Sequence, residues 1–367
     1  MWSNFITVPR LLLPEGKGVF MRSEISIGHK TISEYSPLFI IAETGVTCNY
    51  DLNIAKELID VVAESGADAI KFIFWFPEEI MSDKTITYSY DSLEGPKTEN
   101  MFDMLNQLRF SLDEWRELKA YGDKRKVIIF STVNSPSGIE YAETLGLEAY
   151  KLSSWDYNYL PLWRRIAALK KPVIIDTGPV KLAEMAKVMQ LMLEAQNDQC
   201  ILLHCTSADS LAEKNMGTIP YLRDTFHALV GYSSRDCHDE TDIMAVALGA
   251  VVLEKRLTLA RNLPGHHHIL SKEPGEFADY VRLIRQVQAA KGRHELNPSQ
   301  KDLIERRKWF RHLVANQDIP QGTKLTPEML EGKRPEPGVS PEYLDFFVGR
   351  VTKRPLKYNE AISWDDI

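Results

Sequence analysis

The sequence predicts an α/β protein made of a (β/α)8 TIM barrel followed by a small β-rich domain. From residue 38 to about residue 257, short β-branched runs alternate with amphipathic stretches in eight successive units. The runs are too short and too uniformly apolar for surface strands, which is typical of parallel strands buried on both faces. After residue 301 the composition changes to short β runs with several prolines and glycines. Eight strands joined by helical crossovers favour a closed barrel.

The first unit of the barrel shows the pattern. A strand is expected at 38–42; Leu52, Ala55, Ile59 and Val62 then recur at helical spacing, and Gly66 ends the helix before a strand at 69–72. Further strands are expected at 127–131, 149–152, 173–176, 201–204, 229–232 and 251–253. Helices are expected near 112–123, 137–145, 160–169, 181–195, 216–227, 239–248 and 275–291.

Two segments lie outside this repeat. The connection from Phe74 to Arg109 is unusually long and is expected to form a lid or rim loop over the strand ends. Residues 1–35 precede the first strand and are expected to form a hairpin that caps the bottom of the barrel. The predicted domains are therefore a barrel domain at 1–292, a charged linker at 293–313 and a small domain at 314–367.

A doubly wound open sheet is the alternative fold. It would need a glycine-rich phosphate turn after the first strand, where the sequence has Glu43-Thr44-Gly45-Val46-Thr47-Cys48.

Composition excludes several classes of protein. With 44% apolar and 26% charged residues, the chain is typical of a globular protein with a sizeable core. It shows neither an apolar run long enough to span a membrane nor a signal peptide, so we expect a cytoplasmic protein. A net charge of -7 without a long basic block argues against nucleic-acid binding. The four cysteines form no CxxC pair, which argues against a disulfide framework or zinc knuckle.

Charged and hydroxyl side chains close the predicted strands, where the chemistry of such barrels is located. Lysines and arginines together with hydroxyls suit a phosphorylated, carboxylate-bearing substrate, because each group donates to anionic oxygens. Alternatively, some of the charges form internal ion pairs at the barrel mouth. The residues at these ends are Glu43, Lys71, Thr132, Lys151, Ser153, Ser154, Asp176, Thr177, His204, Thr206, Ser207, Ser233, Ser234, Arg235, Glu254, Lys255 and Arg256.

An ordered set of short motifs carries a resemblance to a known family. The motifs are Ile41-Ala42-Glu43-Thr44-Gly45-Val46, Gly66-Ala67-Asp68-Ala69-Ile70-Lys71-Phe72, Phe130-Ser131-Thr132, Ala149-Tyr150-Lys151-Leu152-Ser153-Ser154, Leu203-His204-Cys205-Thr206-Ser207 and Leu263-Pro264-Gly265. With these motifs the sequence resembles the sialic acid synthase family, which condenses phosphoenolpyruvate with an aldose to make nonulosonic acids. The carboxyl-terminal segment resembles the family's antifreeze-like (SAF) domain through Asp318-Ile319-Pro320-Gln321-Gly322, Lys333-Arg334-Pro335 and Ser363-Trp364-Asp365-Asp366.

The resemblance implies a phosphoenolpyruvate pocket formed by Lys71, Thr132, Lys151, Ser154 and Ser233. Lysines suit the phosphate and the carboxylate, and hydroxyls suit the remaining oxygens. Glu43 matches the family's glutamate beside the reacting carbons and is expected to manage protons. A pairing of Glu43 with one of the two lysines is compatible with that role.

The metal site of the family is altered in this sequence. The family holds its metal with a histidine in a Ser-Asp-His element and another in a Glu-Lys/Arg-His element. Here these elements read Ser233-Ser234-Arg235 and Glu254-Lys255-Arg256, with 21 positions between the two arginines and no gap. Arginine stays protonated and has no lone pair, so the usual metal should be absent, and no cofactor is expected. We expect Arg235 and Arg256 to stabilise oxyanions instead.

A relocated metal site is the alternative. It would be built from His238 and the run His266-His267-His268 on loops at the same face of the barrel.

The positions that would contact the acceptor sugar also depart from the family. Thr47-Cys48-Asn49-Tyr50 replaces Asn-His-Asn-Gly, Ile73 replaces a glutamine, and Asp176 replaces a serine. The resemblance implies that the acceptor-binding residues are Asp156, Asp209, His267, His268 and Arg334. Of these, His267 stands where the family has aspartate and Asp209 where it has tyrosine. The acceptor should therefore differ from N-acetylmannosamine.

The predicted function is condensation of phosphoenolpyruvate with an aldose-type acceptor to a 3-deoxy-2-ulosonic acid and phosphate. A non-catalytic or repurposed anion-binding homologue is the alternative. We also expect a homodimer in which the SAF domain lies over the partner's active site, because so small a domain is marginal alone. The tract Lys333-Arg334-Pro335-Glu336-Pro337-Gly338 matches the family loop that carries an arginine into the partner's site.

Overall fold

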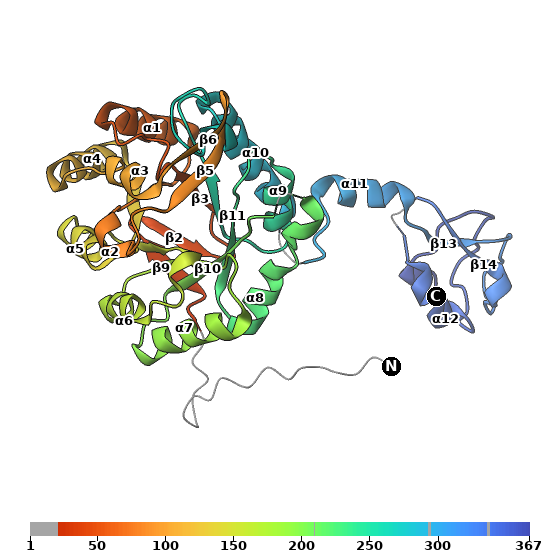
Figure 1. Cartoon of the computed structure of the whole chain (residues 1–367). Helices are drawn as coiled ribbons and strands as arrows, with labels where there is room; N and C mark the ends of the chain where they lie inside the picture. Colours follow the sequence, from red (N-terminus) through yellow and green to blue (C-terminus); the bar gives the residue numbers. More distant parts are fainter. Residues whose placement is uncertain (1–20, 209, 293–294, 336–337) are drawn as a thin grey trace. The chain divides into compact units, whose positions relative to one another are not determined.

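The computed structural model describes residues 21–208, 210–292, 295–335 and 338–367. The chain divides into two compact units, Met1–Gly292 and Arg293–Ile367, which are described separately. Figure 1 shows a ring of helices around the strands of the first unit. Among the described residues, no helix has both the length and the apolar character needed to cross a membrane.

The described part of the first unit contains a closed barrel in which each strand pairs in parallel with its neighbours. This confirms the predicted (β/α)8 fold and excludes the open sheet. The barrel strands are β3 (Phe39–Glu43), β4 (Ala69–Ile73), β7 (Ile128–Thr132), β8 (Tyr150–Leu152), β9 (Val173–Asp176), β10 (Cys200–Cys205), β11 (Leu229–Ser233) and β12 (Val252–Arg256).

A long helix follows each of these strands. The first of them illustrates why the sequence folds this way: the Asp51 side chain caps it, Gly66 ends it in the left-handed conformation at φ 77°, and its apolar positions are buried. The helices are α1 (Leu52–Ser65), α4 (Leu112–Arg125), α5 (Pro136–Thr144), α6 (Leu160–Leu169), α7 (Leu182–Glu194), α8 (Thr218–Phe226), α9 (Glu240–Ala247) and α10 (Pro274–Lys291).

A hairpin closes the bottom of the barrel. Strands β1 (Glu24–Ile27) and β2 (Lys30–Ser33) pair antiparallel. Ile25, Ile27 and Ile32 are buried in one cluster with the first inward-facing residues of the barrel strands. The described part of the predicted cap thus contains this hairpin, whereas residues 1–20 lie outside the described residues.

The long connection after β4 forms a folded rim. It contains α2 (Pro77–Ile80), the antiparallel pair β5 (Thr87–Ser92) and β6 (Gly95–Asn100), and α3 (Met101–Gln107). Tyr88 and Tyr90 pack their rings against His266, 5.3 and 5.6 Å away between centroids. The expected rim segment is therefore present, and it reaches the loop after β12.

The second unit has a small core of its own. Helix α11 (Gln300–Trp309) lies within the stretch expected as a linker and buries none of its residues. Strands β13 (His312–Ala315) and β14 (Leu330–Lys333) pair antiparallel, and the short helix α12 (Leu344–Phe347) follows. The buried side chains of this unit are Leu313, Ala315, Ile319, Leu325, Leu330, Val339, Phe347, Leu356 and Ile362.

Candidate active site

A cavity of about 590 Å³ lies at the carboxyl ends of the barrel strands. Glu43, Thr132, Asp176, Ser233 and Arg256 are each the last residue of a strand, and each lines this cavity. Parallel strands all end at one rim, so residues far apart in the sequence converge there.

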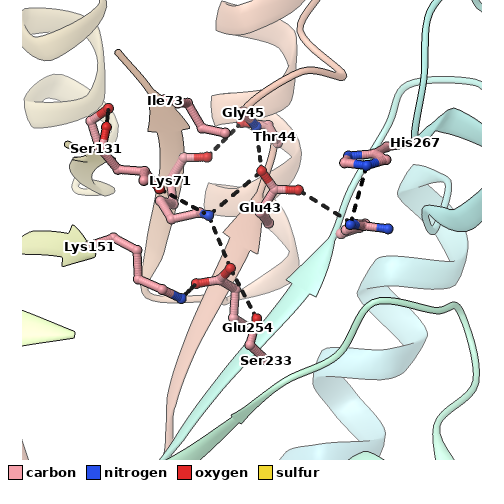
Figure 2. A network of polar contacts seen from close by, with 12 residues as sticks. Glu43, Thr44, Gly45, Lys71, Ile73, Ser131, Lys151, Ser233, Glu254 and His267 are labelled. Carbon is pink, nitrogen blue, oxygen red and sulfur yellow. Dashed lines mark hydrogen bonds and ion pairs between the residues drawn. The ribbon is translucent and has the colours of Figure 1, made fainter. Parts of the chain in front are cut away.

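Two buried lysines form a chain of ion pairs with carboxylates in this cavity. Lys151 Nζ lies 2.6 Å from Glu254 Oε2 and 2.8 Å from Asp176 Oδ1. Lys71 Nζ lies 3.1 Å from Glu254 Oε1 and 3.7 Å from Glu43 Oε1. Figure 2 shows Glu254 between the two lysines. Glu254 therefore holds both ammonium groups toward the same space.

The pKa directions follow from this arrangement. Burial alone would raise the pKa of Glu254, but the charges of Lys151 and Lys71 lower it to about 2. Burial alone would lower the pKa of Lys151, but the charges of Asp176 and Glu254 raise it. Burial raises the pKa of Asp176 although Lys151 opposes it. Lys151 and Glu254 are therefore charged at neutral pH, whereas Asp176 is protonated more easily than an ordinary aspartate.

The two carboxylate oxygens of Glu43 differ in their hydrogen bonding. Its Oε1 accepts a hydrogen bond of 2.8 Å from the backbone N–H of Gly45. A side chain at Gly45 would collide with this oxygen and with Ile73, so the turn needs glycine. Its Oε2 is buried, lies 3.8 Å from Arg256 Nε and accepts no hydrogen bond from any residue that the structure describes. A buried carboxylate oxygen without a donor is available to a ligand or to a proton.

The two arginines lie on the other side of the cavity. Arg256 is buried and donates through Nη1 to the carbonyl of Arg235 at 2.9 Å. Its Nη2 lies 3.5 Å from His267 Nε2. Arg235 is partly exposed and donates to Ser207 Oγ. Guanidinium groups therefore occupy the positions where the sialic acid synthase family is expected to bind its metal.

The residues present do not fit a metal at this site. Arg235 and Arg256 have no lone pair for a cation, and their charges repel it. Across the described residues, no three His, Cys, Asp or Glu side chains are grouped so that they could hold a metal ion. The relocated site at His238 and His266-His267-His268 is therefore not assembled. Thr258 and Asn49 contact the two ring nitrogens of His268, at 2.7 and 3.1 Å.

The three consecutive histidines point in different directions. His266 and His267 line the cavity, whereas His268 is buried behind it. Burial lowers the pKa of His266 and of His268 to about 4, and it lowers the pKa of His267 well below its ordinary value. All three rings are neutral at pH 7.

One part of the cavity wall is apolar. Trp75, Met101, Met104, Leu105 and Trp155 line it, and they come from the rim segment and from the loop after β8. Asp156 lies beside Trp155, and burial raises the pKa of its carboxyl group to about 6. The cavity thus combines an ionic floor with an apolar side that carries one carboxyl group.

The structure brings most of the predicted site residues together. Those that line the cavity are Glu43, Lys71, Thr132, Lys151, Ser154, Asp156, Ser233, Arg235, Arg256 and His267. His268 is excluded from the cavity wall, and Asp209 lies outside the described residues. Arg334 belongs to the second unit, where its Nε donates to the carbonyl of Trp309 at 2.6 Å.

The sequence placed Asp176 and Glu254 at strand ends, and Asp176 among the acceptor positions, but did not predict that they pair with the two lysines. Their position at strand ends was the available signal. Among the described residues that line the cavity, Lys71, Lys151, Arg235 and Arg256 face four carboxyl groups, those of Glu43, Asp156, Asp176 and Glu254. The expected internal ion pairs are therefore present in the same cavity as the candidate site residues.

Comparisons with known proteins decide the family. The NeuB family model matches residues 58–296, and the SAF domain model matches residues 310–367. The chain belongs to the NeuB family. It is thereby an enzyme of the phosphoenolpyruvate-dependent class that makes sugar acids by forming a carbon–carbon bond.

Named relatives cover nearly the whole chain. An N,N'-diacetyllegionaminic acid synthase from Campylobacter jejuni is 33% identical over 88% of this chain and 98% of its own length. The human N-acetylneuraminate-9-phosphate synthase is 32% identical over 89% of this chain and 91% of its own. The solved N-acetylneuraminic acid synthetase from Leptospira borgpetersenii, in complex with citrate, is 27% identical. It matches with a TM-score of 0.69 over 78% of this chain and 96% of its own.

Proposed function

We propose that this NeuB-family enzyme condenses phosphoenolpyruvate with an aldose-type acceptor without the usual metal, and that the acceptor is not N-acetylmannosamine. The products would be a 3-deoxy-2-ulosonic acid of the nonulosonic class and phosphate. The observation that carries the proposal is the free Oε2 of Glu43, which is buried in the same cavity as two ion-paired lysines and two arginines. The named relatives, synthases of N,N'-diacetyllegionaminic acid and N-acetylneuraminate 9-phosphate, support the product class.

The donor would bind at the lysine end of the cavity. Lys71 and Lys151 supply charge for the phosphate and carboxylate, and Thr132, Ser154 and Ser233 supply hydroxyls. Thr132 Oγ1 lies 3.4 Å from Lys71 Nζ, so both groups can donate hydrogen bonds to one oxygen of phosphoenolpyruvate.

The chemistry would proceed in three events. A bond forms between C3 of phosphoenolpyruvate and the aldehyde carbon, and the carbonyl electron pair moves to the aldehyde oxygen, which takes a proton. Water adds at C2 and releases a proton. The C2 hydroxyl then becomes a carbonyl as the bond from C2 to the phosphate oxygen breaks, and the phosphate leaves with the hydroxyl proton. Glu43 Oε2 would accept and return the proton, since no described residue donates a hydrogen bond to this oxygen.

Arginine charge would replace the metal in this scheme. A developing alkoxide needs positive charge that is fixed before the reaction, in a site that excludes water. Arg256 is buried beside Glu43, and Arg235 lines the same wall. Both are permanently charged and fit this role.

The acceptor would lie against the apolar side. Asp156 and His267 offer polar contacts there, and Trp155, Met101 and Met104 suit an acyl or methyl substituent. His268 would act by holding the loop that carries His267. Asp209 and Arg334 remain proposed acceptor contacts from the sequence resemblance.

The assembly proposed is a homodimer in which the SAF unit of one protomer covers the barrel mouth of the other. The exposed aromatic side chains Tyr343, Phe346 and Trp364 on that unit are compatible with a protein contact. The cytoplasmic location stays a prediction.

A phosphate-release assay tests the function. Purified protein is incubated with phosphoenolpyruvate and a panel of hexoses, hexosamines and their N-acyl derivatives. Phosphate release that depends on one of the aldehydes is expected, together with a product of the combined carbon number by mass spectrometry. Binding of phosphoenolpyruvate without release for any aldehyde would favour the alternative, a non-catalytic anion-binding homologue.

A further inference from the structure

His267 has one ring nitrogen with a neighbour and one without. It follows β12 in the left-handed conformation, with φ 73°, and lines the cavity. Its Nε2 lies 3.5 Å from Arg256 Nη2, as Figure 2 shows for the labelled His267. Its Nδ1 is buried and has no hydrogen-bond partner within the described part of the chain.

Arg256 determines which ring nitrogen of His267 carries the hydrogen. A guanidinium can only donate, so Nε2 of His267 must accept from Arg256 and has no hydrogen of its own. A neutral imidazole then carries its hydrogen on Nδ1. The neutral state is expected because burial disfavours the cation, and Arg256, His266, Arg235 and Lys71 all add to that effect.

This nitrogen belongs to a ring that lines the cavity. Burying an N–H group without a partner costs free energy, so its partner is expected to be an oxygen in the cavity. Arg256 connects this donor to the proposed base, since its Nε lies 3.8 Å from Glu43 Oε2. The His267 ring, through Nε2, and Glu43 Oε2 are thus contacted by the same guanidinium.

We propose that neutral His267 donates a hydrogen bond from Nδ1 to the carbonyl oxygen of the acceptor aldehyde. Arg256 acts on this oxygen through His267, because its charge next to Nε2 strengthens the Nδ1–H as a donor. Arg256 Nη1 already donates to the carbonyl of Arg235, and its Nη2 faces His267. The inference rests on the proposed condensation and adds a residue that contacts the reacting oxygen.

Nitrogen-15 NMR of the full-length, histidine-labelled protein tests the tautomer without any substrate. The spectrum should show one ring whose signals vanish in His267→Gln, protonated at Nδ1 and unprotonated at Nε2, and unchanged between pH 5.5 and 8. A His267 ring that is cationic at pH 7, or protonated at Nε2, would overturn the inference.

Kinetics test the role of this donor. His267→Ala should lower kcat about 100-fold, the effect of removing one donor to a developing oxyanion. Its affinity for phosphoenolpyruvate, measured by calorimetry, should stay within twofold and shows that the variant is folded. His267→Gln should keep most of the rate, because its amide can both accept from Arg256 and donate to the ligand. The kcat of His267→Asp should be as low as that of His267→Ala.

The matched control is His29→Ala, which changes an exposed histidine on the hairpin at the opposite end of the barrel. It should behave as wild type. Wild-type protein that releases no phosphate with any aldehyde contradicts the proposed function. An active wild type whose kcat is matched by His267→Ala contradicts only the role of His267.

Discussion

Each lysine of the site is placed between two carboxylates. Isolated buried charges are costly, and pairing makes them tolerable. Lys151 contacts Asp176 and Glu254, and Lys71 contacts Glu254 and Glu43. Anionic phosphoenolpyruvate must therefore compete for the lysines with the carboxylates that already pair with them. The strength of donor binding depends on this competition as well as on the lysines themselves.

Substitutions on the two sides of this competition should have opposite effects. Lys71→Ala and Lys151→Ala should each weaken phosphoenolpyruvate binding at least tenfold, because each removes a charge-assisted contact of about 1.5–3 kcal/mol. Asp176→Ser should tighten binding several-fold, since it frees Lys151 from one carboxylate. Calorimetry at pH 7 measures all three, with Lys119→Ala on α4 as the control. Unchanged affinity in both lysine variants would mean that the donor binds elsewhere.

Asp156 predicts how acceptor binding depends on pH. Burial raises the pKa of this carboxyl group to about 6, so it is ionised above that pH and neutral below it. A carboxylate accepts hydrogen bonds from sugar hydroxyls better than a carboxylic acid does. The KM for the acceptor should rise about tenfold from pH 7.5 to pH 5, in step with protonation of a group of that pKa.

The measurement is a steady-state pH series at saturating donor. Asp156→Asn should have a high KM that no longer changes across this range. A variant that keeps the wild-type pH profile would exclude Asp156 as the titrating group.

The residues of the site were predictable in part. Strand ends and motifs located the lysines, Glu43 and the arginines, because the end of a buried run is visible in the sequence. The pairing of Glu254 with Lys151 could not be assigned, since Glu254 on β12 reaches Lys151 on β8 across the barrel interior. Spacing along a chain does not report which side chains meet across a closed sheet.

At the scale of elements, the barrel was more predictable than its rim. Buried strands and amphipathic helices have strong apolar patterns, and these gave the repeat of strand and helix. The β5–β6 hairpin has mostly polar residues and is held by cross-strand contacts, such as Ser89 Oγ to Thr98 Oγ1 at 2.8 Å and Tyr90 to Glu99 at 2.9 Å. Such a hairpin lacks the alternation that signals a strand.

Helix α3 provides a prediction about the rim. Met101 and Met104 line the apolar side of the cavity. The double variant Met101→Ser, Met104→Ser should raise the KM for an N-acyl acceptor at least tenfold, because each loses apolar contact area. It should leave phosphoenolpyruvate affinity unchanged, since the lysines lie on other elements.

The comparison that isolates this effect uses a second acceptor without the acyl group. Its KM should change little in the double variant. Equal losses for the two acceptors would show that α3 does not contact the acyl substituent.

At the scale of the whole molecule, the second unit poses the question of a shared site. It has a small core, and Arg334 contacts Trp309 within the same unit. If Arg334 enters the partner's cavity in a homodimer, one active site needs residues from two chains. The sequence resemblance predicts this arrangement, and it is open to a complementation experiment.

Mixing two inactive variants tests the shared site. Arg334→Ala and Glu43→Gln should each have little activity alone. In a mixed dimer one site carries both lesions and the other carries neither, so the mixture should regain up to about a quarter of the wild-type activity after random subunit exchange. Confirmed exchange without regained activity, or an active species that sediments as a monomer, would refute the shared site.

The central claim is that arginine charge replaces a metal ion in a working synthase. The most direct measurement is aldehyde-dependent phosphate release by the wild-type enzyme before and after exhaustive treatment with EDTA, with metal content determined on the same sample. We predict an unchanged rate and no stoichiometric divalent metal, because Arg235 and Arg256 can neither bind a cation nor lose their charge. Activity that EDTA abolishes and Mn²⁺ or Mg²⁺ restores would contradict the claim.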